Sequence, residues 1–188
     1  MDSMYRIFIS FKKTNPLDGS LTKEYEMAKN LFAYLTNNGY QDQVFLSEEE
    51  LEKQGDSNFN KNIEKALDEA EVMIVVSDNP AFANEDWVRD EWDGFLNEIK
   101  SKRKRGTLYN LTTKSVMIGD LPYGLRKYTR LFYQENYDLL LSYIKHFLES
   151  KDSAIVLDWN QQKKDKYYEY TEFGYIRESF SNLSERNI

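Results

Sequence analysis

The sequence predicts a doubly wound α/β domain, in which a parallel sheet carries helices on both faces. Short apolar runs rich in β-branched and aromatic residues alternate five times with helix-patterned segments over about the first 148 of the 188 residues. The run 72–76, Val-Met-Ile-Val-Val, is apolar at every position, which is typical of a central strand buried on both faces. Aromatic residues make up 15% of the chain, enough to fill the core of such a domain.

The first half of the domain reads as strand, helix, strand. Residues 5–11 form a short run rich in apolar, β-branched and aromatic residues and predict a strand, which the turn-rich loop 14–20 follows. A helix is expected from about Thr22, because apolar residues recur at helical spacing up to Asn38-Gly39, a pair that ends helices. Residues 43–47 predict the second strand.

The second half continues the alternation around the central strand. Further strands are expected over 107–111 and 129–133. Asp120-Leu121-Pro122 predicts the start of a short helix, since proline costs little at an early helical position. Amphipathic helices are expected where apolar residues recur every three or four positions, over 63–70, 85–100 and 139–147.

Composition excludes several classes of site. The chain has no cysteine, so it has no disulfide scaffold, thiolate zinc site or cysteine nucleophile. Its single histidine, His146, falls in the last expected helix, far in sequence from the other candidate residues, and is not expected to serve a Ser-His-Asp relay. Catalysis would depend on some of the 32 carboxylates. The acidic run 48–52 is interpreted as a solvated loop, so no metal is expected.

Charge and hydropathy limit the partners. The net charge of −7 argues against a general nucleic-acid binder. No apolar run approaches the length that crosses a bilayer, and the first residues lack the basic and apolar segments of a signal peptide. We therefore expect a cytoplasmic protein with no membrane partner.

Residues 149–188 do not continue the alternation and are interpreted as a C-terminal extension of a domain spanning 1–148. Aromatic residues recur between Lys163 and Phe180, among many charged ones. Because disordered tails are poor in aromatics, we expect the extension to dock on the domain or on a partner.

The segment 77–92 follows the central strand and opens the third helix, where ligands bind in open α/β sheets. Trp87 and Glu91 are spaced i, i+4 and lie one step around the helix from its apolar stripe. Two interpretations remain open. The pair forms a ribose-and-base site, with a half-buried carboxylate beside an indole face, or it is a core-edge tryptophan and a solvated glutamate that the helix dipole stabilises.

Five motifs in order give the chain a resemblance to the TIR (Toll/interleukin-1 receptor-like) domain over roughly residues 4–148. They are the opening strand Ile7–Phe11, the second strand Phe45-Leu46-Ser47 with a BB-type loop over 51–56, Ser77-Asp78 to Pro80, the Trp-x-x-x-Glu segment Trp87–Glu91, and Asp120–Arg126 before the fifth strand. The resemblance implies a flavodoxin-like five-stranded sheet in the order 2-1-3-4-5. The Trp-x-x-x-Glu segment resembles the branch of the family that cleaves NAD+.

The resemblance also assigns roles to individual residues. It implies that Glu91 is the catalytic residue and that Trp87 stacks against the substrate. Lys12 and Lys13 stand where the family often has arginines; they either meet a diphosphate as point charges or are simply solvated lysines at a loop start. The remaining substrate-binding residues that the resemblance implies are Phe11, Phe45, Ser47, Ser77 and Asp78.

The implied activity is cleavage of the bond between nicotinamide and ribose, giving ADP-ribose or a cyclic ADP-ribose-type product. It needs neither cofactor nor metal, because NAD+ is the substrate. By family analogy we expect self-association, a role in antiphage defence and an effector that senses the product. The alternatives are a non-catalytic TIR–TIR adaptor and a nucleoside (deoxy)ribosyltransferase. A receiver domain is disfavoured, because the first strand ends in Lys12-Lys13 rather than in an acidic pair.

Overall fold

The computed structural model describes residues 5–46 and 59–150, and these form one α/β domain. Its sheet has five parallel strands in the order β2-β1-β3-β4-β5, as predicted. The strands are β1 (Ile7–Ser10), β2 (Val44–Phe45), β3 (Val72–Ser77), β4 (Thr107–Thr112) and β5 (Thr129–Phe132). Every residue of β3 is buried, which confirms it as the central strand.

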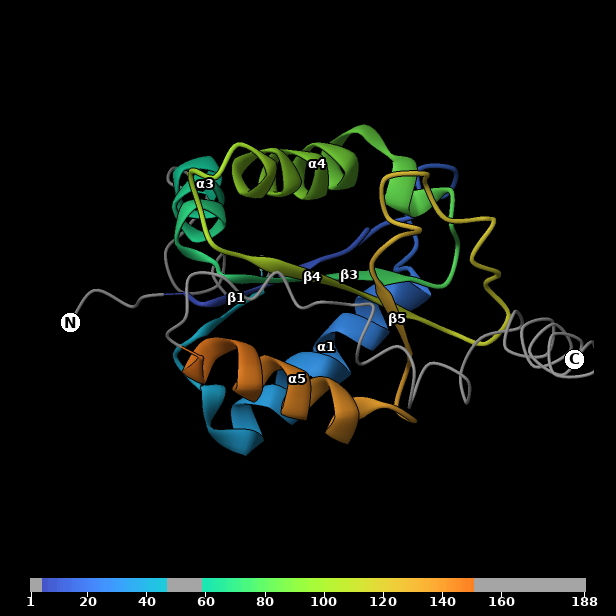
Figure 1. Ribbon diagram of the computed structural model, residues 1–188. Helices are drawn as coiled ribbons and strands as arrows, with labels where there is room; N and C mark the ends of the chain where they lie inside the picture. The colour runs from blue at the N-terminus through green and yellow to red at the C-terminus, as the bar shows by residue number, and fades with distance from the viewer. Residues whose placement is uncertain (1–4, 47–58, 151–188) are drawn as a thin grey trace, which may run out of the picture. The chain divides into compact units, whose positions relative to one another are not determined.

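Helices cover both faces of the sheet (Figure 1). One face carries α1 (Lys23–Leu35) and α5 (Tyr137–Glu149), and the other carries α3 (Phe59–Glu69) and α4 (Asp86–Lys100). The alternation of side chains along β1 explains this division, because Ile7 and Ile9 pack in the core beneath α1 and α5, whereas Phe8 packs in the core beneath α3 and α4.

The first helix begins and ends as the sequence indicates. Thr22 is the N-cap of α1, and its side chain accepts a hydrogen bond from the backbone N–H of Tyr25. The helix continues as a wider turn, η1 (Thr36–Tyr40), in which Gly39 has a φ of 97°. Only glycine adopts this left-handed conformation without strain, so Gly39 terminates the helix.

The prediction of a short helix that begins at Asp120-Leu121-Pro122 is wrong. Residues 118–128 form turns closed by the bonds from Leu125 N to Pro122 O and from Tyr128 N to Leu125 O. The side-chain amide of Asn110 on β4 donates to the carbonyls of Leu125 and Tyr128, at 3.0 and 3.3 Å. These bonds tie the turns to the sheet, and the two backbone bonds within the segment span three residues each, as in turns, rather than the four of an α-helix.

At the amino ends of the strands, an ion-pair cluster joins the sheet to α5. Glu71 accepts from Arg6 at 2.7 Å and from Arg105 at 2.9 Å. Both arginines also donate to backbone carbonyls in the last turn of α5, and the Arg105 guanidinium lies 4.1 Å from the centroid of the Phe147 ring. These contacts hold the end of α5 against the sheet, far from the edge where the candidate site lies.

Several expectations fall outside the described residues, namely the BB-type loop, Ser47, the acidic run 48–52 and the extension over 151–188. Within the described ranges, no helix is both long and apolar enough to cross a membrane.

Candidate active site

The carboxyl edge of the sheet holds a cluster of buried polar side chains on the face that α4 covers. Ser10, Ser77 and Thr112 are the last residues of β1, β3 and β4, and each is at most 1% exposed. Strand alternation directs Ser10 to the same face as Phe8, which packs beneath α3 and α4. The sheet therefore presents hydroxyl groups, rather than apolar side chains, to the first turns of α4.

Glu91 reaches this cluster from α4. Its carboxylate is buried and accepts a hydrogen bond of 2.6 Å from the Ser10 hydroxyl, and the Trp87 side chain donates a second one. Burial raises the pKa of Glu91 from its ordinary value of 4.5 to about 7, while the two hydrogen bonds act in the opposite direction. The interpretation of Glu91 as a solvated helix glutamate is therefore wrong, and the carboxylate is more deeply buried than the half-buried one expected.

Trp87 lies in the first turn of α4 and is 51% exposed. The apolar stripe of the same helix is buried as predicted, with Val88, Trp92 and Phe95 each at most 4% exposed. A large aromatic ring that keeps half of its surface in solvent, while hydrogen-bonding a buried carboxylate, leaves an indole face available for stacking.

Lys12 and Lys13 follow β1 and are both partly buried. The Lys12 ammonium lies 3.6 Å from a carboxylate oxygen of Glu85, the N-cap residue of α4. The Lys13 ammonium lies 5.8 Å from the centroid of the Tyr25 ring. Neither is a simple solvated lysine, and Lys12 places a positive charge at the end of the strand that carries Ser10.

Two of the other predicted residues are buried in the hydrophobic core. Phe45 is 0% exposed and stacks on Phe8, with ring centroids 5.1 Å apart. Its position therefore does not support the predicted contact with substrate. Phe11 is 7% exposed and packs near Tyr25, so it supports the loop that carries the lysines rather than facing solvent.

Asp78 belongs to a second set of contacts at the same edge. Its carboxylate accepts hydrogen bonds from Lys23 at 3.0 Å and from Thr113 at 2.5 Å. The neighbouring residue Ser77 donates to the backbone carbonyl of Asn79 at 3.2 Å. Asp78 and Ser77 thus fix the loop between β3 and α4, and their hydrogen bonds go to that loop and its neighbours.

Sequence reasoning missed Glu24, a carboxylate only 1% exposed in the first turn of α1. It accepts the backbone N–H groups of Asp78 and Asn79 at 2.9 and 2.6 Å, and so anchors the loop that leads to α4. An acidic residue two positions after an N-cap is ordinarily explained by the helix dipole, so its spacing gave no signal of a longer-range role.

The arrangement brings Ser10, Trp87 and Glu91 together, and it brings Lys12 to the start of the same helix. Among the described residues, no group of three or more histidine, aspartate and glutamate side chains is placed to hold a metal ion. What the cluster offers is one buried, hydrogen-bonded carboxylate beside an aromatic face and a lysine. Such a group stabilises positive charge that develops on a bound ligand.

Comparison with known proteins identifies the family. The family model for TIR domains matches residues 7–141, which cover all five strands and the start of the final helix. No curated protein matches the chain. Because the matched segment spans well over half of the sequence, and the strand order agrees with the one this family implied, the chain belongs to the TIR domain family.

Proposed function

We propose that this TIR domain cleaves the bond between nicotinamide and ribose in NAD+. The observation that supports the proposal best is the buried Glu91 carboxylate at the carboxyl edge of the sheet, hydrogen-bonded by Ser10 and Trp87. A carboxylate in that environment is an unfavourable choice for stability alone, and ionisable groups with displaced pKa values concentrate at functional sites.

The chemistry requires only one carboxylate. When the C1′–N bond breaks, the electron pair moves to the pyridinium nitrogen, so nicotinamide leaves as a neutral molecule and needs no acid. Positive charge develops on the ribosyl C1′ and O4′, and ionised Glu91 stabilises it and accepts hydrogen bonds from the ribose hydroxyls. Water then attacks C1′ and loses a proton, which gives ADP-ribose; attack by a nucleophile on the adenosine half gives a cyclic product instead.

The other residues position the substrate. The half-exposed indole of Trp87 stacks on a ring of NAD+, and its place beside Glu91 brings that ring close to the carboxylate. Lys12, and with it Lys13, provides positive charge for the diphosphate, as single point charges rather than bidentate pairs. Asp78 and Ser77 act indirectly, by holding the loop before α4.

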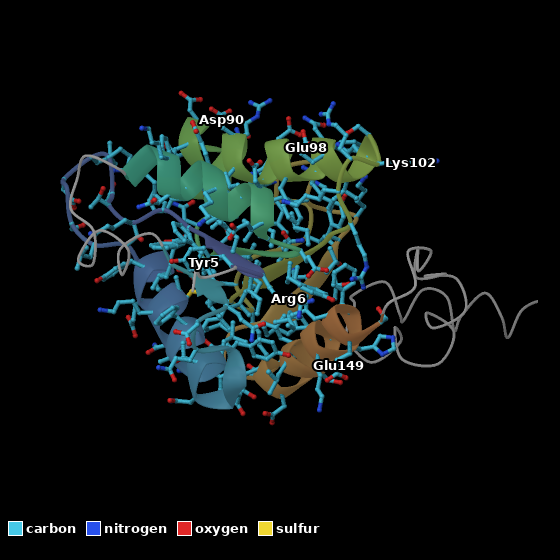
Figure 2. All side chains as sticks on the ribbon, turned by 90° about the vertical axis from the view of Figure 1, so that its left-hand side faces the viewer. Tyr5, Arg6, Asp90, Glu98, Lys102 and Glu149 are labelled. Carbon is cyan, nitrogen blue, oxygen red and sulfur yellow. The ribbon has the colours of Figure 1, made fainter. Side chains whose placement is uncertain are left out.

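The test is to incubate the purified protein with NAD+ and to measure free nicotinamide by chromatography. Glu91→Gln should reduce its release by at least about 100-fold, since removing one charge-stabilising group typically costs that much. Asp90→Asn is the matched control, because Asp90 is the exposed neighbour on the outer surface of α4 (Figure 2). Equal turnover by wild type and Glu91→Gln would reject the assignment.

The activity should depend on pH in a defined direction. The reaction needs ionised Glu91, and burial raises the pKa of this group to about 7. The rate should therefore rise about tenfold per pH unit below pH 7 and level off above it. A rate that is flat between pH 5.5 and 8 would show that Glu91 does not have to be ionised.

Self-association is part of the proposal. Four large apolar side chains are exposed on the segments that follow β1 and β4, namely Leu17, Leu21, Met117 and Tyr123. Burying them between copies would remove apolar surface from water. Nicotinamide release per molecule should therefore rise with protein concentration, in parallel with the mass measured by light scattering. Constant specific activity across that range would argue against it.

We extend the proposal to a cytoplasmic enzyme whose nucleotide product signals to a separate effector in antiphage defence. Mass spectrometry of the product is the decisive measurement for this step, since a cyclic product is suited to signalling and ADP-ribose indicates simple hydrolysis. A plain adaptor would bind other TIR domains and release no nicotinamide. A nucleoside (deoxy)ribosyltransferase would instead cleave nucleosides offered in the same assay.

A further inference from the structure

The Ser10 hydroxyl has no access to a ligand, yet it contacts the proposed catalytic group. Ser10 is 1% exposed, and its Oγ lies 2.6 Å from Oε2 of Glu91 in a buried contact. The strand backbone fixes its position, since Ser10 is paired in register with Val75 of the central strand. Glu91 therefore meets a donor that belongs to the rigid sheet rather than to its own helix.

The second donor, Trp87, is neither buried nor part of the sheet. It belongs to the same helix as Glu91 and is half exposed, so a ligand that stacks on its ring can turn the indole away from Glu91. A hydroxyl also donates more strongly to an ionised carboxylate than to a neutral one. Of the two donors, Ser10 is the one that the sheet backbone holds in place.

We infer that Ser10 is a positioning residue for the proposed reaction: its hydroxyl fixes the orientation of the Glu91 carboxylate and favours the ionised form that the chemistry uses. The inference rests on the proposed function for its catalytic meaning, but the coupling between the two side chains can be measured without turnover. Burial raises the pKa of Glu91 and the hydrogen bond from Ser10 lowers it, so removing this bond should raise the pKa further.

The test compares Ser10→Ala with the control Thr129→Val. Thr129 is the first residue of β5, outside the cluster that Glu91 reaches, and its buried hydroxyl has no hydrogen-bond partner among the residues that the structure describes. A hydrogen bond to a charged group corresponds to about one to two pKa units. The acid limb of the pH–rate profile should therefore move up by at least about one unit in Ser10→Ala, with a roughly tenfold lower rate at pH 6 and a plateau kept at high pH.

Two further variants protect the test against misfolding. Ser10→Thr keeps the hydroxyl and should restore the acid limb to its original position. Ser10→Cys replaces the hydroxyl with a slightly larger thiol, which is a weaker donor, and should move the limb partway. Thr129→Val should leave the limb in place. A loss of rate that is equal at every pH, or a limb that does not move in Ser10→Ala, overturns the inference.

A second readout separates this inference from the proposed function. Glutamate labelled with ¹³C at the side-chain carboxyl gives a titration curve for Glu91, identified as the resonance missing in Glu91→Gln. The midpoint should be higher in Ser10→Ala than in wild type. If it moves while wild type releases no nicotinamide, the proposed function fails and the coupling stands. If nicotinamide is released and the midpoint does not move, the inference fails and the function stands.

Discussion

Glu91→Gln should make the protein more stable while it removes the proposed activity. Glu91 is buried, and its pKa is raised from 4.5 to about 7 in the folded chain. A group whose pKa is raised on folding binds its proton more tightly in the folded state than in the unfolded one. The free energy of unfolding therefore falls as pH rises from about 4.5 to about 7, and the loss is complete above that range. Glutamine is neutral at every pH, so the free energy of unfolding of Glu91→Gln should not fall in this way.

The magnitude follows from the same pKa. Each pKa unit corresponds to about 1.4 kcal/mol, so the full penalty is about 3 kcal/mol. Relative to wild type, Glu91→Gln should gain about 1 kcal/mol at pH 5.5 and about 3 kcal/mol at pH 8. The amide keeps a carbonyl oxygen that can accept the bond from Ser10, and it keeps the side-chain volume, so packing is preserved.

The assay is urea unfolding of both proteins at the two pH values, followed by circular dichroism. Glu98→Gln is the matched control, because Glu98 lies on the outer surface of the same helix and Arg103 holds the pKa of its carboxyl below the ordinary value (Figure 2). A lowered pKa means that the ionised form of Glu98 stabilises the folded protein, so Glu98→Gln should not raise the free energy of unfolding at pH 8. A gain for Glu91→Gln that is absent, or equal at both pH values, would refute the reasoning.

The remaining predictions concern packing around the site, and urea unfolding tests each of them. A Cβ on Gly124 would lie 2.8 Å from the indole of Trp92, so Gly124→Ala should lower the free energy of unfolding by about 1–3 kcal/mol. Gly94→Ala, in the middle of α4 with open space around it, should raise it by about 0.5–1 kcal/mol. Thr112→Val removes a buried hydroxyl that has no partner in the described part of the chain and should raise it by about 1 kcal/mol. Arg105→Lys loses the forked contacts to Glu71 and to the end of α5 and should lower it by about 1–2 kcal/mol. A change of the opposite sign in any of these variants contradicts its explanation.

The fold could be predicted because the signals that specify it are local. Strand and helix patterns alternate along the chain, and the fully apolar run at 72–76 identifies the central strand. The short helix near Pro122 failed for a non-local reason. The side-chain amide of Asn110, on the preceding strand, donates to the carbonyls of Leu125 and Tyr128, and no pattern within the segment itself indicates such a partner.

The candidate site could be located from the sequence, but its chemical state could not. Helical spacing placed both Trp87 and Glu91 one step from the apolar stripe of α4, and therefore predicted similar burial for the two side chains. The structure separates them, with Trp87 half exposed and Glu91 buried. The difference comes from Ser10, which is 81 residues away in sequence and provides a polar partner for the carboxylate beneath α4. Spacing within one helix carries no information about such a partner.

The burial of Glu91 has opposite effects on folding and on catalysis. Removing water from the carboxylate costs the folded state about 3 kcal/mol at pH 8, because the charged form loses hydration that two hydrogen bonds replace only in part. The same loss of water strengthens the attraction between this carboxylate and a cationic ribosyl centre, since charges interact more strongly where the dielectric is low. If Glu91→Gln gains stability and loses nicotinamide release together, both effects arise from the one buried charge. If it gains stability and wild type releases no nicotinamide, the buried charge lowers stability without serving this reaction.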